Sequence, residues 1–327
     1  MDTESRPIRD GFESLRRIAR IVAWPVWNLD TGRVRAPIRA LLPLVVTFLG
    51  FALVQSLAQR RFDGPTGIVA TALGFALVLA VVVPASARLL DRRPVRDYGL
   101  SFDREWWRSF AAGALAATVV NGGTLLVSLA AGWVRVSGFA VNSGDALSFP
   151  TAALVVFTYI VIVNGAFEEF AFRGAMLTNL AEGAGGYLPR RAAVGVAVVC
   201  SSLVFAYMHS GKVAHVGQYG YYLVAGLVLG GAYVVTGELA LSVGFHAFYD
   251  FTMSVVFGLG VSQRTPELVH LARSGRSFWI GETGVLQVVF AVVGGLLLVG
   301  YARVRDGRLR VDERLTRWRS SDATTGE

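Results

Sequence analysis

Eight long apolar stretches divide the sequence, and they limit what the chain can fold into. Each is 17 to 25 residues long, which is the length that a helix needs to cross the hydrocarbon core of a bilayer. Helices are expected because backbone groups that face lipid must form their hydrogen bonds within their own segment. We therefore predict an all-α polytopic membrane protein with about eight transmembrane helices. The predicted spans are 38–57, 68–89, 110–131, 152–176, 192–209, 219–235, 239–259 and 285–301.

The charged residues lie mainly between these stretches. Hydrophobic residues make up 54% of the 327 positions and charged residues 17%, whereas a soluble domain has about a quarter charged residues. If the spans alternate in direction, 23 of the 31 Lys and Arg residues lie on the side that carries both termini, and seven lie on the other side. This bias predicts that both termini are cytoplasmic. The net charge of +8 then suits a face against anionic lipid. With no base-reading motif, we expect no nucleic-acid partner.

The two ends of the chain differ from its apolar centre. Residues 1–37 combine arginines with apolar residues at roughly helical spacing, which fits either an interfacial amphipathic helix or a solvated basic arm. We predict a cytoplasmic N-terminal segment over 1–37, a transmembrane domain over 38–303, and a basic cytoplasmic tail over 304–327.

A few chemically active side chains lie inside the predicted spans. An ionisable group at membrane depth is costly and is therefore a candidate for function. The runs are FEEFAFRG in the fourth span, FAYMH at the end of the fifth and HAFYD in the seventh. Their notable residues are Glu168, Glu169, Arg173, Phe205, His209, His246 and Asp250.

Helical spacing pairs some of these residues. Glu169 and Arg173 are four positions apart, in the order that favours an ion pair on one helix face. We interpret them as a buried clamp, which leaves Glu168, about 100° further round the helix, as the free carboxylate. His246 and Asp250 are also four apart, so this carboxylate can hold the imidazole in one tautomer.

A carboxylate and two histidines on three helices can activate water. Glu168 can act as a general base directly, or it can hold zinc or another divalent metal together with His209 and His246. The single cysteine, Cys200, excludes a Cys-rich metal site. Proton-coupled transport uses the same residue types, and a lone buried histidine can simply join two helices. The residues alone leave these alternatives open.

Taken together, the three runs resemble the motifs of one family. EEFAFRG matches an EExxxR motif, Phe205 to His209 matches FxxxH, and His246 to Asp250 matches HxxxN with Asp in the last place. The chain is thus similar to the CPBP intramembrane proteases, the group of type II CAAX prenyl proteases and bacteriocin-processing (Abi-like) proteins. The resemblance covers about residues 95–255.

The resemblance is tightest over 150–255, and it implies an eight-helix fold with a polar, water-accessible cavity inside the plasma membrane. It implies hydrolysis of a peptide bond in a membrane-embedded or lipidated protein, with prenylated CAAX proteins as one substrate class. Glu168 and His209 would activate water, and His246 with residue 250 would stabilise the oxyanion. Glu169 would belong to the same set, with Arg173 and Phe205 in support.

Two features of the sequence differ from what is common in this family. The family is commonly described as metallopeptidases, but no HExxH helix is present, and a metal-free glutamate mechanism fits the same residues. Asp250 replaces the common Asn, and an ionised Asp cannot donate to an oxyanion. Asp250 is then protonated, orients His246 or binds a metal.

Alternating spans also place Glu168 in the cytoplasmic half of the fourth span and His209 at the outer end of the fifth. They can meet only if the fifth span starts deeper or is bent, so we expect the boundary of the fifth span to be wrong. Two other functions remain as alternatives. One is a non-catalytic scaffold or immunity-type partner, and the other is a proton-coupled transporter, for which no inverted repeat is visible.

Overall fold

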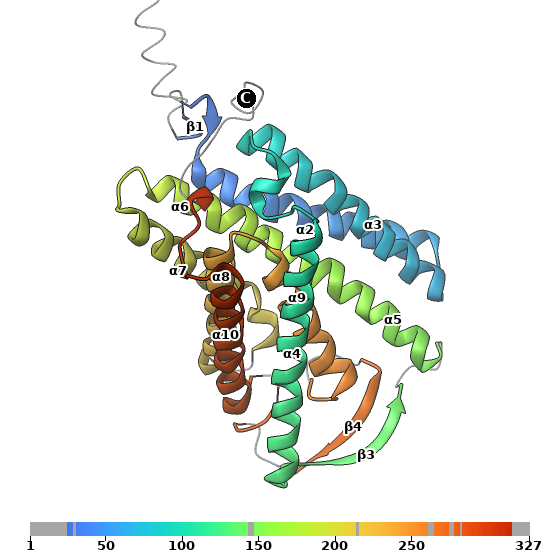
Figure 1. The fold of residues 1–327 in the computed structure, drawn as a ribbon. Helices are drawn as coiled ribbons and strands as arrows, with labels where there is room; N and C mark the ends of the chain where they lie inside the picture. Colours follow the sequence, from blue (N-terminus) through green and yellow to red (C-terminus); the bar gives the residue numbers. More distant parts are fainter. Residues whose placement is uncertain are drawn as a thin grey trace, which may run out of the picture.

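The computed structural model of the chain is a bundle of helices with two small sheets (Figure 1). Seven helices in the described part are long and apolar enough to cross a membrane. This confirms the prediction of an all-α polytopic membrane protein. The helix considered within residues 1–37 falls largely outside the described residues. The structure describes residues 25–28, 31–142, 147–213, 216–260, 265–274, 278–281 and 283–315.

The first two spans form an antiparallel pair, α2 (Ala36–Arg61) and α3 (Gly64–Ala85). Their inner faces meet where the ring of Phe51 stacks on that of Phe75 at 4.1 Å. Their outer faces carry leucines such as Leu73, which is 68% exposed. Apolar side chains on an outer face are costly in water but stable against lipid, so this pair fits a position at the edge of the bundle.

After α3 the chain turns back through two short helices. A π-helical turn, η1 (Ser86–Asp91), and a 3-10 turn, η2 (Val95–Tyr98), lead to α4 (Arg104–Ala130). Asp103 caps α4, because its side chain accepts a hydrogen bond from the backbone N–H of Trp106 at 2.9 Å. Such a cap satisfies one of the free donors at a helix start.

The fourth span is one helix of 36 residues, Phe149–Ala184, which crosses the molecule obliquely in Figure 1. It consists of α5 (Phe149–Tyr159), the π-helical η3 (Ile160–Glu168) and η4 (Phe170–Leu177), and α6 (Thr178–Ala184). The predicted span 152–176 was therefore too short.

The extra length removes the conflict in depth between Glu168 and His209. At about 1.5 Å per residue, Glu168 lies about 24 Å from the end of α6. His209 follows α7 (Arg190–Met208) and lies about 28 Å from its start by the same rise. Because α6 leads directly into α7, the two residues reach similar depths.

The predicted seventh span, 239–259, is a shorter inner helix. It consists of α9 (Ala240–Phe251) and the π-helical turn η7 (Thr252–Val256), and it is not among the seven long spans. Most of α9 is buried. Two glycines let it approach α4 closely: a Cβ on Gly244 would lie 2.1 Å from the Phe110 carbonyl oxygen, and one on Gly113 would lie 2.3 Å from that of Leu241. The sequence pattern missed this role because a buried helix is as apolar as a lipid-facing one.

The remaining long helices are α8 (Tyr219–Thr236) and α10 (Val285–Asp306). The 3-10 turns η5 (Ser210–Lys212) and η6 (Val216–Gln218) join α7 to α8. Gly226 of α8 packs on Ser202 of α7, where a Cβ would meet Ser202 Cβ at 2.8 Å. After α10, the turn η8 (Glu313–Leu315) packs back on the bundle with Leu315 buried.

Two small antiparallel sheets, which the all-α prediction did not include, join distant segments. β1 (Trp27–Asn28) pairs with β2 (Arg33–Val34). β3 (Val134–Val141) pairs with β4 (Glu267–Arg273) and links the end of α4 to the segment after η7 (Figure 1). In β4, Nδ1 of His270 lies 2.5 Å from Oε2 of Glu267, and the His270 side chain is 43% exposed.

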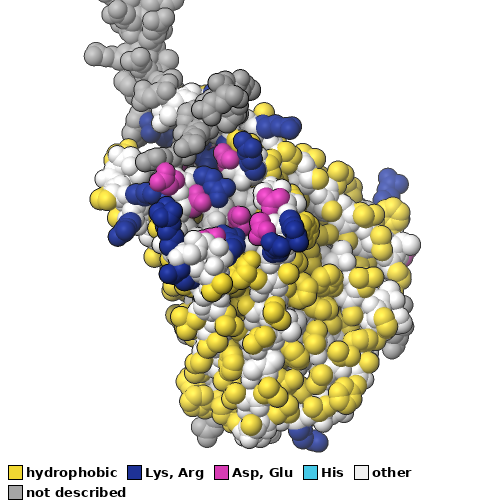
Figure 2. All heavy atoms as spheres, in the orientation of Figure 1, with side chains coloured by type: hydrophobic (Ala, Val, Ile, Leu, Met, Phe, Trp, Pro, Cys, Tyr) yellow, Lys and Arg dark blue, Asp and Glu magenta, His cyan; other side chains and the backbone are white. Residues whose placement is uncertain are grey.

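Ionic side chains gather at one end of the molecule, around β1 and α6, above a broad apolar belt (Figure 2). Beneath them lies a buried network that we call the arginine cluster. Arg39 pairs with Asp91 at 2.9 Å, and Arg39 and Arg93 pair with Glu182 at 2.9 and 2.7 Å. The cluster ties α2, η1 and α6 together, and its members are Arg33, Arg39, Asp91, Arg93, Asn179 and Glu182.

Candidate active site

The three predicted motifs meet in the structure around one carboxylate. Glu168 ends η3, His209 follows α7, and His246 lies in the middle of α9. Oε2 of Glu168 is 4.0 Å from Nε2 of His209 and 3.9 Å from Nε2 of His246. Oδ2 of Asp250 is 3.7 Å from the same His246 nitrogen. We call Glu168, His209, His246 and Asp250 the histidine cluster.

The orientation of His209 is set by its own helix. Its Nδ1 is 2.8 Å from the backbone carbonyl oxygen of Phe205, and a carbonyl can only accept a hydrogen bond. Nδ1 therefore carries the proton, so that Nε2 of the neutral ring has a free lone pair. The ring also contacts those of Phe205 and Tyr222, with centroids 4.5 and 4.4 Å away. These contacts leave Nε2 directed towards Glu168.

The orientation of His246 is set by Glu169, which lies next to the free carboxylate in the sequence. Nδ1 of His246 is 2.7 Å from Oε1 of Glu169, and the same oxygen accepts a hydrogen bond from Arg173 at 2.9 Å. Glu169 and Arg173 are almost fully buried. The predicted clamp is thus formed, and it also holds the imidazole. Glu169 thus contacts Nδ1 of His246, while the predicted partner Asp250 lies beside the other ring nitrogen, 3.7 Å from Nε2.

Asp250 has a different partner that the sequence analysis missed. Its Oδ2 accepts a hydrogen bond from the side-chain amide of Asn164, which lies in η3 one helical turn before Glu168. Asp250 therefore acts as an acceptor here. The cluster still contains an amide beside His246, but η3 supplies it. An isolated Asn four residues before Glu168, inside an apolar run, was the available signal.

One oxygen of Glu168 is left without a partner. Its Oε2 is buried and forms no hydrogen bond with any residue that the structure describes. Leaving a buried acceptor unpaired costs about 1–3 kcal/mol, and more when the group is charged. The 3.9 and 4.0 Å separations are too long for direct hydrogen bonds. They suit one water that bonds to Glu168 and to an imidazole.

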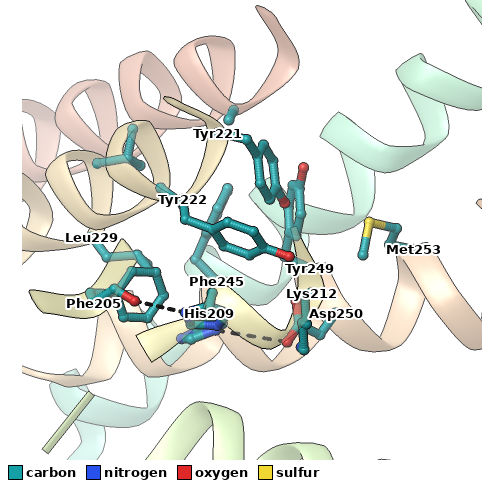
Figure 3. A pocket seen from close by; sticks show the side chains of 14 residues that line it. Phe205, His209, Lys212, Tyr221, Tyr222, Leu229, Phe245, Tyr249, Asp250 and Met253 are labelled. Atoms are coloured by element: carbon teal, nitrogen blue, oxygen red, sulfur yellow. Dashed lines mark hydrogen bonds and ion pairs between the residues drawn. The ribbon is translucent and has the colours of Figure 1, made fainter. Parts of the chain in front are cut away.

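A small cavity adjoins the cluster, with a volume of about 50 Å³. This volume holds about three to five waters at about 10–15 Å³ each. Glu168 does not line it but lies within 4.0 Å of two residues that do. Aromatic rings form much of the wall (Figure 3). The residues labelled there are Phe205, His209, Lys212, Tyr221, Tyr222, Leu229, Phe245, Tyr249, Asp250 and Met253.

The side chains that we considered as metal ligands are further apart than the ligands of a tetrahedral zinc site. Ligand atoms around tetrahedral zinc, each about 2.0–2.1 Å from the metal, lie about 3.3 Å from one another. The Glu168 carboxylate is further than this from both imidazoles. Across the described ranges, no group of three His, Cys, Asp or Glu side chains could hold a metal ion.

Comparison with known proteins agrees with the motifs. Residues 150–252 match the family model for "Type II CAAX prenyl endopeptidase Rce1-like". No curated protein and no solved structure matches the chain. The matched segment begins at the start of the long fourth helix and includes Asn164 and the whole histidine cluster. This segment agrees with the core of about 150–255 that the motifs predicted, and it is similar to the Rce1-like type II CAAX prenyl endopeptidases.

Proposed function

We propose that this protein is an intramembrane endopeptidase in which Glu168 activates the attacking water. The observation that carries the proposal is the buried, unpartnered Oε2 of Glu168, which faces Nε2 of both His209 and His246 at 4.0 and 3.9 Å. A carboxylate, two oriented imidazoles and room for water are the components that general-base hydrolysis requires.

In the proposed first step, Glu168 removes a proton from the water, and the resulting hydroxide attacks the carbonyl carbon of the scissile peptide bond. His209 accepts a hydrogen bond from the other O–H of the water at its free Nε2 and so orients the water. The protonated Glu168 then delivers its proton to the leaving amine as the carbon–nitrogen bond breaks. Oriented groups lower the barrier because little rearrangement is needed during reaction.

The proposed oxyanion site consists of His246 and Asn164. Glu169 supports the positively charged form of His246, since its carboxylate lies 2.7 Å from Nδ1, and Nε2–H then donates to the oxyanion. Asn164 has two amide hydrogens, one of which it donates to Asp250. The other would complete the site. Asn164→Ala should lower kcat by about a hundredfold with little change in KM. Unchanged kcat would contradict this role.

The proposed substrate is a membrane-embedded or lipidated protein. The cavity lies among helices whose outer faces are apolar, so the scissile bond must reach it from within or beside the bilayer. The description of the matched family supports CAAX-type prenylated proteins as the first class to test. The apolar wall that Phe245, Tyr249 and Met253 contribute is compatible with a lipid-modified chain.

The test compares protein termini in membrane fractions of cells that carry wild type or Glu168→Gln at equal expression. Glu105→Gln is a matched control, because Glu105 is 56% exposed on α4 and outside the cluster. We expect a defined set of new termini that Glu168→Gln abolishes and the control retains. Full cleavage by Glu168→Gln would contradict the proposal. Unchanged termini, with a deletion phenotype rescued equally by both chains, would indicate a scaffold.

A further inference from the structure

Lys212 is the single lysine of the 327 residues, since the other 30 cationic side chains are all arginine. It lies three residues after His209, at the end of η5, and it lines the cavity together with His209, His246 and Asp250 (Figure 3). Its backbone N–H donates to the carbonyl oxygen of His209 at 2.8 Å. Its position is thus tied to a residue of the histidine cluster.

The ammonium group of Lys212 has no ion pair or side-chain hydrogen bond with the described residues, and the residue is exposed. His246, whose charged form the proposed mechanism uses, is held by Glu169, and Arg173 is buried against the same carboxylate. Among the described residues that line this cavity, Lys212 is therefore the one lysine or arginine, and its ammonium group is available to a ligand.

The charges around the cavity make such a cation necessary for one class of ligand. Glu168 and Asp250 are both carboxylates, and neither lies within ion-pair distance of Lys212. A substrate that brings its own carboxylate would be repelled by these two groups at short range. A lysine at the same wall offsets the repulsion and favours the anion. Lysine suits this role because it is a compact charge on a flexible stem.

We propose that Lys212 binds a carboxylate of the substrate and so determines which peptide bond is cut; this inference rests on the proposed function. Along a 3-10 turn with a rise of about 2 Å per residue, Lys212 lies about 6 Å beyond His209. An extended peptide covers this distance in about two residues, at about 3.3–3.6 Å each. The carboxylate therefore lies two to three residues from the scissile bond. It belongs either to the C-terminus of the chain or to an Asp or Glu side chain.

The first experiment maps cleavage sites in membrane fractions from cells with wild type, Lys212→Arg, Lys212→Gln or Lys212→Glu. Wild-type sites should have a carboxylate within three residues, and Lys212→Arg should retain them. Lys212→Gln should cut these sites about tenfold less, through a higher KM rather than a lower kcat. Lys212→Glu should shift cleavage towards sites with Lys or Arg nearby.

The outcomes separate this inference from the proposed function. An identical set of sites for wild type and Lys212→Glu would overturn the role of Lys212 while leaving the endopeptidase intact. The absence of any Glu168-dependent site in wild type would instead overturn the proposed function.

A second experiment does not depend on turnover. Because the chain has a single lysine, an amine-reactive acetylating reagent labels Lys212 and the terminal amine alone, and mass spectrometry measures each separately. Purified full-length Glu168→Gln protein is treated with this reagent in the presence of one of three N-acetylated apolar tetrapeptides. The first ends in a carboxylate, the second ends in an amide, and the third ends in an amide and contains Glu. Protection by the free C-terminus or by Glu alone identifies the source of the carboxylate. Equal labelling with all three peptides would contradict the proposal.

Discussion

The protein contains two buried ionic networks that differ in how their charges are paired. In the arginine cluster the guanidinium groups lie 2.7–2.9 Å from the carboxylates of Asp91 and Glu182. In the histidine cluster the closest contacts of Glu168 and Asp250 with imidazole nitrogens are 3.7–4.0 Å. Both networks join segments that are distant in the sequence, so their position in the chain does not explain the difference.

The difference indicates separate roles for the two networks. A buried ion pair recovers its desolvation cost only when the geometry is close and the remaining hydrogen bonds are satisfied. In the arginine cluster every carboxylate has a close guanidinium partner, although Nε of Arg93 is left without a hydrogen bond, and the cluster holds α2, η1 and α6 together. The histidine cluster leaves one acceptor of Glu168 unpaired, which costs stability and leaves space for a reacting water. Four predictions test this contrast, in order of decreasing expected effect.

Replacing Glu168 with Gln should lower cleavage by at least about 10³-fold, because an amide cannot take a proton from water. The same change should leave the thermal midpoint in detergent unchanged or raise it, since it removes an unpaired buried charge. Activity on an identified substrate and a melting curve give the two readouts. A large fall in the midpoint would mean that Glu168 is structural, like the arginine cluster.

Replacing Asp91 with Ala should mainly lower stability, whereas Glu168→Gln should mainly lower activity. It removes one of the two carboxylates that pair with Arg39, and also the acceptor for the Tyr98 hydroxyl, which lies 2.6 Å away. Removing one partner from a buried ionic network costs up to about 3–5 kcal/mol of unfolding free energy. The yield of folded protein and its melting midpoint in detergent should both fall, with Glu105→Gln as the unaffected control. A stable Asp91→Ala protein would remove the distinction between the two networks.

Replacing Glu169 with Gln tests the residue that lies between the two types of network. Glu169 is closely paired with Arg173, yet it also holds Nδ1 of His246. We expect a fall in kcat of about a hundredfold, because the charged form of His246 loses its carboxylate. The fall in kcat on the alkaline side of the pH profile should begin at a lower pH than in wild type. An unchanged pH profile would show that Glu169 serves only as a helix clamp.

The smallest effect concerns an ion pair near the chain end. Burial alone would raise the pKa of the Asp312 carboxyl, but hydrogen bonds from the Arg314 side chain and backbone hold that pKa below its usual range. A depressed pKa in the folded state contributes stability above the unfolded value of about 4 and loses it as pH falls through the folded value.

Asp312→Asn should therefore lower stability at neutral pH by less than about 1 kcal/mol. The difference from wild type should shrink below about pH 4. Melting midpoints between pH 3 and 7 provide the measurement, and a difference that stays constant with pH would contradict the pairing.

Several features could be predicted because they depend on properties local to the chain. The long spans follow from their length and hydropathy, since both report directly on the cost of burying backbone in lipid. The Glu169–Arg173 pair follows from the four-residue spacing of one helix. The membership of the histidine cluster follows from three short motifs in a known order.

Other features depend on contacts that spacing along the chain does not encode. Glu169 and His246 are 77 positions apart, so nothing in the HAFYD run showed that Glu169, and not Asp250, would hold His246. Asn164 gains its role only because η3 passes beside α9. The β3–β4 sheet depends likewise on segments that are more than a hundred residues apart.

The sequence by itself thus determined that the chain crosses a membrane and which residues meet in the histidine cluster. Hydropathy and helical periodicity act over one helix, and the motifs lie within one turn. Only the tertiary structure decided that α9 is an inner helix, that Glu168 and His209 share one depth, and that Oε2 of Glu168 has no hydrogen-bond partner among the described residues. These outcomes depend on how whole helices pack against one another, where glycine contacts and distant hydrogen bonds outweigh local preference.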